Sequence, residues 1–253
     1  MSVLDSFELS GKVALVTGGT KGLGRAVAAS LAQAGADLAT VSRRPDPEFE
    51  QEVTALGRAY GHFPADLTHR DQTRTVVPAV LKQMGRIDIL VNCAGICPRT
   101  EVLNFPEADW DATLEIDLTA SFVLTQQAGA DMLSRGWGKV INVASVLAFQ
   151  GGRSVPAYAA AKHGLLGLTK SFANDWAAKG VNVNAIAPGY FSTELTSDLW
   201  QDPERYQAIL ERIPAQRWGK GPDIAGLALF LASPASDYVN GSVFTVDGGW
   251  MSL

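Results

Sequence analysis

Cysteine, histidine and methionine are scarce in this chain. Its 253 residues include two cysteines, three histidines and four methionines. The two cysteines, Cys93 and Cys97, stand in the stretch CAGIC, which lacks the CxxC spacing of zinc and redox sites and has no second ligand pair beside it. We therefore expect two reduced thiols and no metal site.

A strong positive charge and a long apolar run are lacking as well. The formal net charge is −5, which argues against a surface that binds nucleic acid or anionic membranes. No run approaches the ~20 apolar residues that a membrane span needs, and the opening MSVLDSFELSGK has no basic segment followed by an apolar one. These features favour a cytoplasmic protein without nucleic-acid or membrane partners.

Short apolar runs alternate with helical patterns from end to end. The runs are rich in β-branched residues and are continuous, which is typical of parallel strands buried on both faces. Six runs are clear and one is weaker: 12–17, 37–42, 87–92, 139–145, 181–188 and 242–248, with 59–66 as the weaker one. Amphipathic stretches lie between them, among them 24–35, which Gly35 ends, and 106–133. The alternation predicts one α/β domain over 1–253, a doubly wound (Rossmann) fold with seven parallel strands and helices on both faces.

A glycine-rich turn, TGGTKGLG, follows the first predicted strand. Gly18, Gly22 and Gly24 would let the chain turn sharply and bring its backbone close to a pyrophosphate. The helix that follows would offer free N–H groups and the positive end of its dipole. The turn, with Thr20 and Leu23 in it, therefore predicts a dinucleotide site, although a turn that is glycine-rich without a ligand is the alternative.

The tip of the second predicted strand bears on which dinucleotide binds. An NAD site usually ends this strand with an acid that pairs with the ribose 2′-hydroxyl. Here the strand runs into Ser42, Arg43 and Arg44, and Lys21 lies inside the glycine turn. A 2′-phosphate would meet cations and no carboxylate, so NADP is favoured over NAD unless these arginines are merely solvated.

Five motifs together point to a family. TGGTKGLG, VNCAG, the serine of NVASVLAF, YAAAK and NAIAPGYFST occur in the order and spacing of the short-chain dehydrogenase/reductase family, which the chain resembles over essentially its whole length. The resemblance implies an NAD(P)-dependent oxidoreductase in which Asp66 and Leu67 bracket the adenine. It also implies a further set of cofactor-lining residues: Asn92, Ala94, Gly95, Pro188, Gly189, Phe191 and Thr193.

The resemblance assigns three catalytic side chains, and their chemistry agrees with it. Tyr158 would pass a proton to or from the substrate oxygen, and Lys162 would hydrogen-bond the nicotinamide ribose. A free phenol has a pKa of about 10, too high for work at neutral pH, but an ammonium four residues on lies on the same helix face and favours the phenolate. Ser145, at the carboxyl end of a predicted strand, would polarise the substrate oxygen.

Two positions depart from the family pattern. Cys93 replaces the second asparagine of NNAG, a change that affects packing only. Asp117, in EIDLTAS, stands where the family has a catalytic asparagine that holds a water between the lysine and solvent. A carboxylate can accept from that water, but its charge can also pair with Lys162 and weaken the effect of the ammonium on Tyr158. We expect activity nonetheless, with Asp117 counted among the catalytic residues.

The second half of the chain is similar to 2-dehydro-3-deoxy-D-gluconate 5-dehydrogenases and gluconate 5-dehydrogenases, in FQGG, KHGLLGLTK and DPERYQAILERIPAQRWG. This similarity implies a sugar acid that is interconverted between a keto and a hydroxyl form. Its carboxylate needs a cation. Arg99, Arg153 and Arg217 are the candidates, unless they are plain surface charges, and Gln150 is a polar candidate. The segment 191–218, rich in aromatic and charged residues, would fold over the substrate as a lid.

Other functions stay open on these residues alone. A 3-oxoacyl-acyl-carrier-protein reductase or a general carbonyl reductase would share every cofactor motif, although an acidic carrier protein requires a basic docking face. A dinucleotide-binding regulator without catalysis is the alternative from another class. The helix that ends near Arg135 and the helix of Tyr158 carry small or apolar residues on more than one side, which predicts a homotetramer, as does the resemblance.

Overall fold

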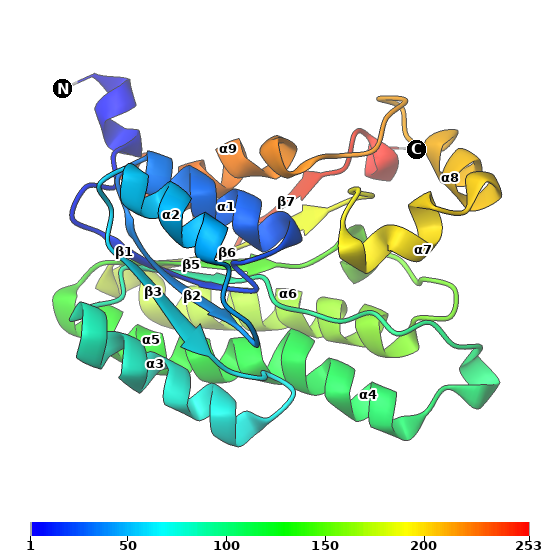
Figure 1. Ribbon diagram of the computed structural model, residues 1–253, viewed down its shortest axis with the longest axis horizontal. Helices are drawn as coiled ribbons and strands as arrows, with labels where there is room; N and C mark the ends of the chain where they lie inside the picture. Colours follow the sequence, from blue (N-terminus) through cyan, green and yellow to red (C-terminus); the bar gives the residue numbers. More distant parts are fainter. Residues whose placement is uncertain (1, 253) are drawn as a thin grey trace.

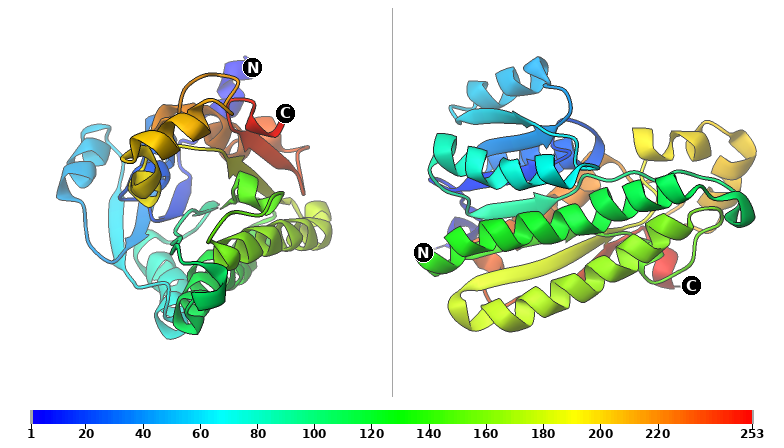
Figure 2. Two further views of the ribbon diagram at one scale, coloured as in Figure 1. Left: turned by 90° about the vertical axis from the view of Figure 1, so that its right-hand side faces the viewer. Right: turned by 90° about the horizontal axis from the view of Figure 1, so that it is seen from below.

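The computed structural model describes residues 2–252, in which one sheet of parallel strands lies between two layers of helices (Figure 1, Figure 2). The order of its seven strands is β3-β2-β1-β4-β5-β6-β7. The strands are β1 (Val13–Thr17), β2 (Asp37–Ser42), β3 (Tyr60–Pro64), β4 (Ile89–Asn92), β5 (Gly138–Val143), β6 (Val181–Pro188) and β7 (Val243–Val246). The predicted doubly wound fold is confirmed, including the weaker strand.

Helices α1, α2 and α9 cover one face of the sheet, and α3, α4, α5 and α6 cover the other (Figure 1). They are α1 (Gly22–Gln33), α2 (Pro47–Ala55), α3 (Arg70–Met84), α4 (Glu107–Leu114), α5 (Ala120–Arg135), α6 (Pro156–Trp176) and α9 (Gly221–Ala232). Two short helices, α7 (Ser197–Trp200) and α8 (Pro203–Leu210), lie beyond the end of the sheet, near the C-terminus. Among residues 2–252, no helix is long and apolar enough to cross a membrane.

The central strands are buried at every position, and most of their residues are apolar, because both faces of the sheet are covered. Val16 and Val91 belong to the core packed under α1 and α9, whereas Leu15 and Leu90 belong to the core under α3 and α5. Neighbouring residues of one strand thus enter opposite cores, as the alternation of side chains along a strand requires.

The stretch 106–133 is not one regular helix. α4 and α5 are joined by a π-helical turn, Glu115–Thr119, which adds backbone to a single turn. Asp117 lies in this turn and its side chain is buried. Hydrophobic periodicity could predict the helix but not the turn, which shifts the periodicity by a residue.

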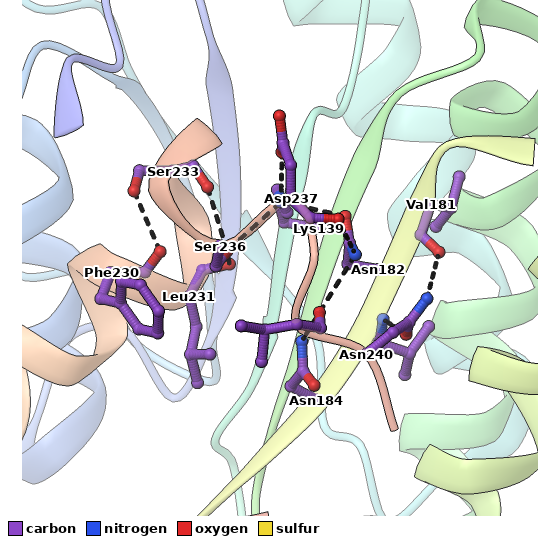
Figure 3. A network of polar contacts seen from close by, with 12 residues as sticks. Lys139, Val181, Asn182, Asn184, Phe230, Leu231, Ser233, Ser236, Asp237 and Asn240 are labelled. Atoms are coloured by element: carbon purple, nitrogen blue, oxygen red, sulfur yellow. Dashed lines mark hydrogen bonds and ion pairs between the residues drawn. The ribbon is translucent and has the colours of Figure 1, made fainter. Parts of the chain in front are cut away.

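A buried lysine ties three elements together at the amino end of β5 (Figure 3). The fully buried Lys139 donates to Asn182 Oδ1 at 2.9 Å, Ser236 Oγ at 3.2 Å and Asp237 Oδ1 at 2.7 Å. An ammonium has three protons, so each finds an acceptor. Asn182 in turn donates to the backbone oxygens of Asp237 and Val239. The network fixes the connection from α9 to β7, and with it the strand that leads into the C-terminal turn.

Candidate active site

A cleft opens at the carboxyl edge of the sheet, beyond the ends of β1, β4, β5 and β6. Its volume is about 1280 Å³. Small-molecule sites usually measure about 300–1000 Å³, so this cleft has room for a dinucleotide together with a small substrate. Its walls come from the glycine turn, the segments that follow these strands, the start of α6, and residues between 188 and 212.

The glycine turn has the shape that a pyrophosphate requires. Gly18 and Gly22 have φ values of 65° and 52°, in the left-handed region that favours glycine. A Cβ on Gly24 would collide with the carbonyl of Gly18. In the part of the chain that the structure describes, no side chain caps the start of α1, where Lys21 is the N-cap residue. The first N–H groups of α1 are therefore available to an anion.

The cations at the tip of β2 and in the glycine turn have protein partners. Arg43 lies 4.0 Å from Asp66 as an ion pair and leaves 78% of its side chain exposed. The Ser42 hydroxyl donates to the backbone oxygen of Arg44 at 2.6 Å. Lys21 pairs with Glu194, across the cleft, at 3.0 Å. These exposed pairs are weak, so both cations can turn to a 2′-phosphate.

Ser145 and Tyr158 meet at the inner end of the cleft. Ser145 follows β5, and its Oγ accepts from the Leu147 N–H at 3.1 Å, which leaves the hydroxyl proton for a substrate oxygen. Pro156 begins α6, in the first position where proline suits a helix, and this places Tyr158 in the first turn. Lys162, one turn farther along, has its Nζ 5.3 Å from the centre of the phenol ring.

Asp117 forms a buried ion pair with Lys162. Lys162 Nζ lies 2.9 Å from Asp117 Oδ1, with side chains 5% and 0% exposed, and it donates to the Val143 carbonyl at 3.0 Å. The second oxygen of Asp117 accepts from the Ile96 N–H at 2.9 Å. A Cβ on Gly95 would collide with this carboxylate. The predicted pairing of Asp117 with Lys162 is thus confirmed as an ion pair.

The charges around Tyr158 act in opposite directions. The pKa of Tyr158 is raised to about 12: burial is the largest cause and Asp117 adds to it, while Lys162 and Ser145 act in the opposite direction. Burial lowers the pKa of Lys162 because it disfavours the charged form. The nearby Asp117 and Tyr158 outweigh burial, so the pKa of Lys162 is raised. Burial raises the pKa of Asp117 against the pull of Lys162. The ammonium does favour the phenolate, but burial outweighs it, so the pKa of the phenol stays above its usual range.

The two cysteines are free thiols. Burial raises the pKa of Cys93 and of Cys97 to about 11. Both are therefore protonated at neutral pH and do not compete with Tyr158 for the proton.

Most of the cofactor-lining residues expected from the sequence lie on the cleft. They are Gly18, Lys21, Gly22, Leu23, Gly24, Ala94, Gly95, Pro188, Gly189, Phe191 and Thr193. Asn92 lies beneath it instead, and its amide donates to Thr125 Oγ1 at 3.1 Å and Asn142 Oδ1 at 2.9 Å. Thr20 and Leu67 are buried. Asn92 therefore supports the cofactor wall by joining β4 to its neighbours rather than by contact.

Of the substrate candidates, Arg99, Gln150 and Arg153 line the cleft. Arg217 is directed elsewhere: its guanidinium holds Asp223 at 2.7 and 2.8 Å. Three residues that sequence reasoning missed lie on the same wall: Tyr190, Arg212 and Trp250. Arg212 stands in the same stretch as Arg217, but only the path of the chain shows which of the two faces the cleft.

The cleft can hold a dinucleotide at one end and pass a proton at the other, which suits hydride transfer between a carbonyl and an alcohol. Fold and site together thus define an NAD(P)-dependent oxidoreductase. Residues 18–251 match the family model described as Enoyl-(Acyl carrier protein) reductase. The chain belongs to the short-chain dehydrogenase/reductase family.

Several relatives are similar over nearly the whole chain. The 2-dehydro-3-deoxy-D-gluconate 5-dehydrogenase of Bacillus subtilis is 51% identical over 249 residues, which cover 98% of each chain. The structure of a putative NAD(P)-dependent gluconate 5-dehydrogenase from Beutenbergia cavernae, with bound NADP, is 42% identical with a TM-score of 0.94, and covers 98% of this chain and 100% of that one. A gluconate 5-dehydrogenase from Burkholderia cenocepacia, in complex with NADP and tartrate, is 38% identical with a TM-score of 0.94 and full coverage of both chains.

Proposed function

We propose that this protein is an NADP-preferring dehydrogenase that interconverts a keto and a hydroxyl group on a sugar acid, such as 2-dehydro-3-deoxy-D-gluconate or D-gluconate. The observation that carries the proposal is a set of three arginines in the cleft that also holds Tyr158. Arg99, Arg153 and Arg212 line one cleft in a chain whose net charge is −5. Relatives named for such substrates support the same class.

The protein's own groups act on the substrate oxygen. Ser145 donates a hydrogen bond to this oxygen and polarises the carbonyl. Tyr158 gives its proton to the oxygen in reduction and takes it back in oxidation. Lys162 stabilises the phenolate that reduction leaves behind, and Asp117 holds Lys162 in place. The nicotinamide ring supplies or accepts the hydride when it is bound.

The preference for NADP rests on the adenosine end of the cleft. Arg43 stands at the tip of β2 with most of its side chain in solvent, and Lys21 lies in the phosphate turn. A 2′-phosphate can replace their weak carboxylate partners. Relatives crystallised with NADP support this preference.

We further propose a cytoplasmic homotetramer with a mobile lid. Phe122 of α5 is 39% exposed and its ring lies 6.0 Å from that of Phe172 of α6, so these two helices share an aromatic outer surface that a second subunit would cover. The proposed lid, 191–218, contributes Leu199 and Ile209 to the cleft wall. Light scattering that reports a monomer at micromolar concentration would refute the tetramer.

A substrate panel tests the activity. Purified protein is mixed with NADP⁺ or NAD⁺ and D-gluconate or 2-dehydro-3-deoxy-D-gluconate, and with NADPH and 5-keto-D-gluconate, while nicotinamide absorbance is followed. Turnover of a sugar acid with preference for NADP is the expected result. Turnover of a 3-oxoacyl thioester but no sugar acid would favour an acyl reductase, a class to which a 38% identical relative from Thermotoga maritima belongs.

A further inference from the structure

The indole of Trp250 is fixed beside the reacting groups. It belongs to the short C-terminal helical turn after β7 and is 5% exposed. Its Nε1 donates to Gln150 Oε1 at 3.0 Å, and its ring lies 4.6 Å from that of Tyr190. Val146, the residue next to Ser145, packs in the same apolar cluster. Trp250 therefore offers a rigid flat surface close to the proton-transfer site.

Arg212 lies on that surface. Its guanidinium carbon is 4.0 Å from the centre of the Trp250 ring, so the two planar groups make a cation–π contact. A guanidinium held through its face keeps the N–H groups along its edge available. Among residues 2–252, no carboxylate lies within ion-pair distance of Arg212. The edge can therefore take a planar anion such as a carboxylate.

Two other arginines on the cleft, Arg205 and Arg99, differ from Arg212 in their contacts. Arg205, also on the cleft, pairs with Asp202 at 3.6 Å. Arg99, which follows β4, lies in the cleft on the side of Cys97. Burial raises the pKa of Tyr190, while Arg212 and Arg99 both lower it. Two arginines from separate segments thus come close to one phenol.

We propose that Arg212, held over the Trp250 ring, and Arg99 form the subsite that binds the substrate's carboxylate beside Tyr190. This inference rests on the proposed function. Gln150 lines the cleft, and because its carbonyl accepts from the Trp250 indole, its amide can offer the substrate only N–H donors. The acid end of the substrate is thereby held away from Tyr158, which leaves the reacting carbon to the phenol.

Kinetics on a matched pair of substrates test the subsite. The pair is the sugar acid that the wild type oxidises fastest and its carboxamide, which has the same planar shape but no charge and carries an NH2 donor in place of one acceptor oxygen. Arg212→Gln should raise KM for the acid about 10–100-fold, with kcat changed less than about threefold, because a charge-assisted pair is lost from binding. KM for the carboxamide should change less than about twofold. Arg212→Lys keeps the charge without the planar fork, so its KM for the acid should fall between.

Arg217→Gln is the matched control. It removes the same charge from the same stretch of chain, and it should change KM for either substrate less than about threefold, since this guanidinium lies away from the cleft and holds Asp223. If Arg217→Gln matches Arg212→Gln, the effect is only the change in the protein's overall charge, and the subsite is refuted.

Binding without turnover separates the inference from the proposed function. Calorimetry on the NADP-loaded Tyr158→Phe protein should show the acid binding about tenfold or more weakly when Arg212→Gln is added. A wild type that turns over no sugar acid overturns the proposed function. A wild type that is active on the acid, with unchanged KM and unchanged calorimetric affinity in Arg212→Gln, overturns the subsite alone.

Discussion

Replacing Asp117 by asparagine removes one charge from the buried centre of the active site. The change keeps the size of the side chain and leaves one oxygen, which can still accept from the Ile96 N–H. It removes the carboxylate that now lies 2.9 Å from Lys162. The lysine keeps its bond to Val143 and regains a proton for the ribose or a water.

The size of the effect follows from the charges. At an effective dielectric constant of about 20, two unit charges 2.9 Å apart attract by about 6 kcal/mol. Desolvation cancels much of this, so we expect Asp117→Asn to lower the free energy of unfolding by about 1–3 kcal/mol. The phenol, with its pKa of about 12, loses a repelling carboxylate and faces an unopposed ammonium. Its pKa should fall by about one to two units.

Activity should be preserved or raised. A lower phenol pKa increases the fraction of phenolate at neutral pH, but it makes each phenolate a weaker base. About half of the pKa shift should therefore appear as a gain in log kcat/KM for oxidation, which is about 3–10-fold. The substitution leaves the equilibrium constant of the reaction unchanged, so kcat/KM for reduction must rise by the same factor. The pH at which oxidation stops rising should move down by about one to two units, in step with the phenol.

The assay is a pH–rate profile for kcat/KM in both directions, with thermal unfolding followed by circular dichroism. Asp111→Asn, which removes an exposed carboxylate from α4, is the matched control and should leave the profile unmoved. A fall in turnover of more than about tenfold in a folded Asp117→Asn protein, or a profile displaced to higher pH, would refute the reasoning. The carboxylate would then be part of the proton path itself.

Three further substitutions test separate parts of the structure. Tyr158→Phe should lower kcat by at least about 10²–10³-fold, while the affinity for NADP, measured by fluorescence, stays within about threefold. Residual activity within about tenfold of wild type would mean that another group gives the proton. Arg43→Asp should move the ratio of kcat/KM from NADP towards NAD by at least about tenfold, because a carboxylate repels the 2′-phosphate, and a wild type that already prefers NAD would remove the premise. Lys139→Met should lower the free energy of unfolding, measured by urea titration, by about 1–3 kcal/mol, because the buried Asn182 oxygen loses its donor. KM should stay unchanged, and a loss of stability under about 0.5 kcal/mol would show that water replaces the ammonium.

The strands could be predicted because burial on both faces leaves a record in the sequence. Each central strand sends neighbouring residues into opposite cores, so apolar residues predominate along the whole run. β3 was the weaker case because it is the edge strand, where Tyr60 and His62 are only partly covered. The pairing of Asp117 with Lys162 could also be anticipated, since the family motifs place both positions at one site.

The substrate wall could not be read in the same way. Arg212 and Arg217 are separated by five positions in one stretch, and the sequence ERIPAQRW does not show which of them faces the cleft. The chain turns sharply between them, with Gln216 at a φ of 51°, and buries Ile213 and Trp218. Arg212 consequently lies on Trp250, and Arg217 turns to Asp223. Trp250 itself comes from the C-terminal turn, whose place beside Gln150 depends on the whole sheet.

The distribution of charge links the departure at Asp117 to the class of substrate. A sugar acid that enters this cleft meets an ammonium at one end and guanidinium groups at the other. Asp117 neutralises Lys162 within a buried pair, whereas Arg212 has no such partner among residues 2–252. The strongest attraction for an anion therefore lies on the Trp250 side of the cleft, because a neutralised pair exerts little field over the length of a sugar.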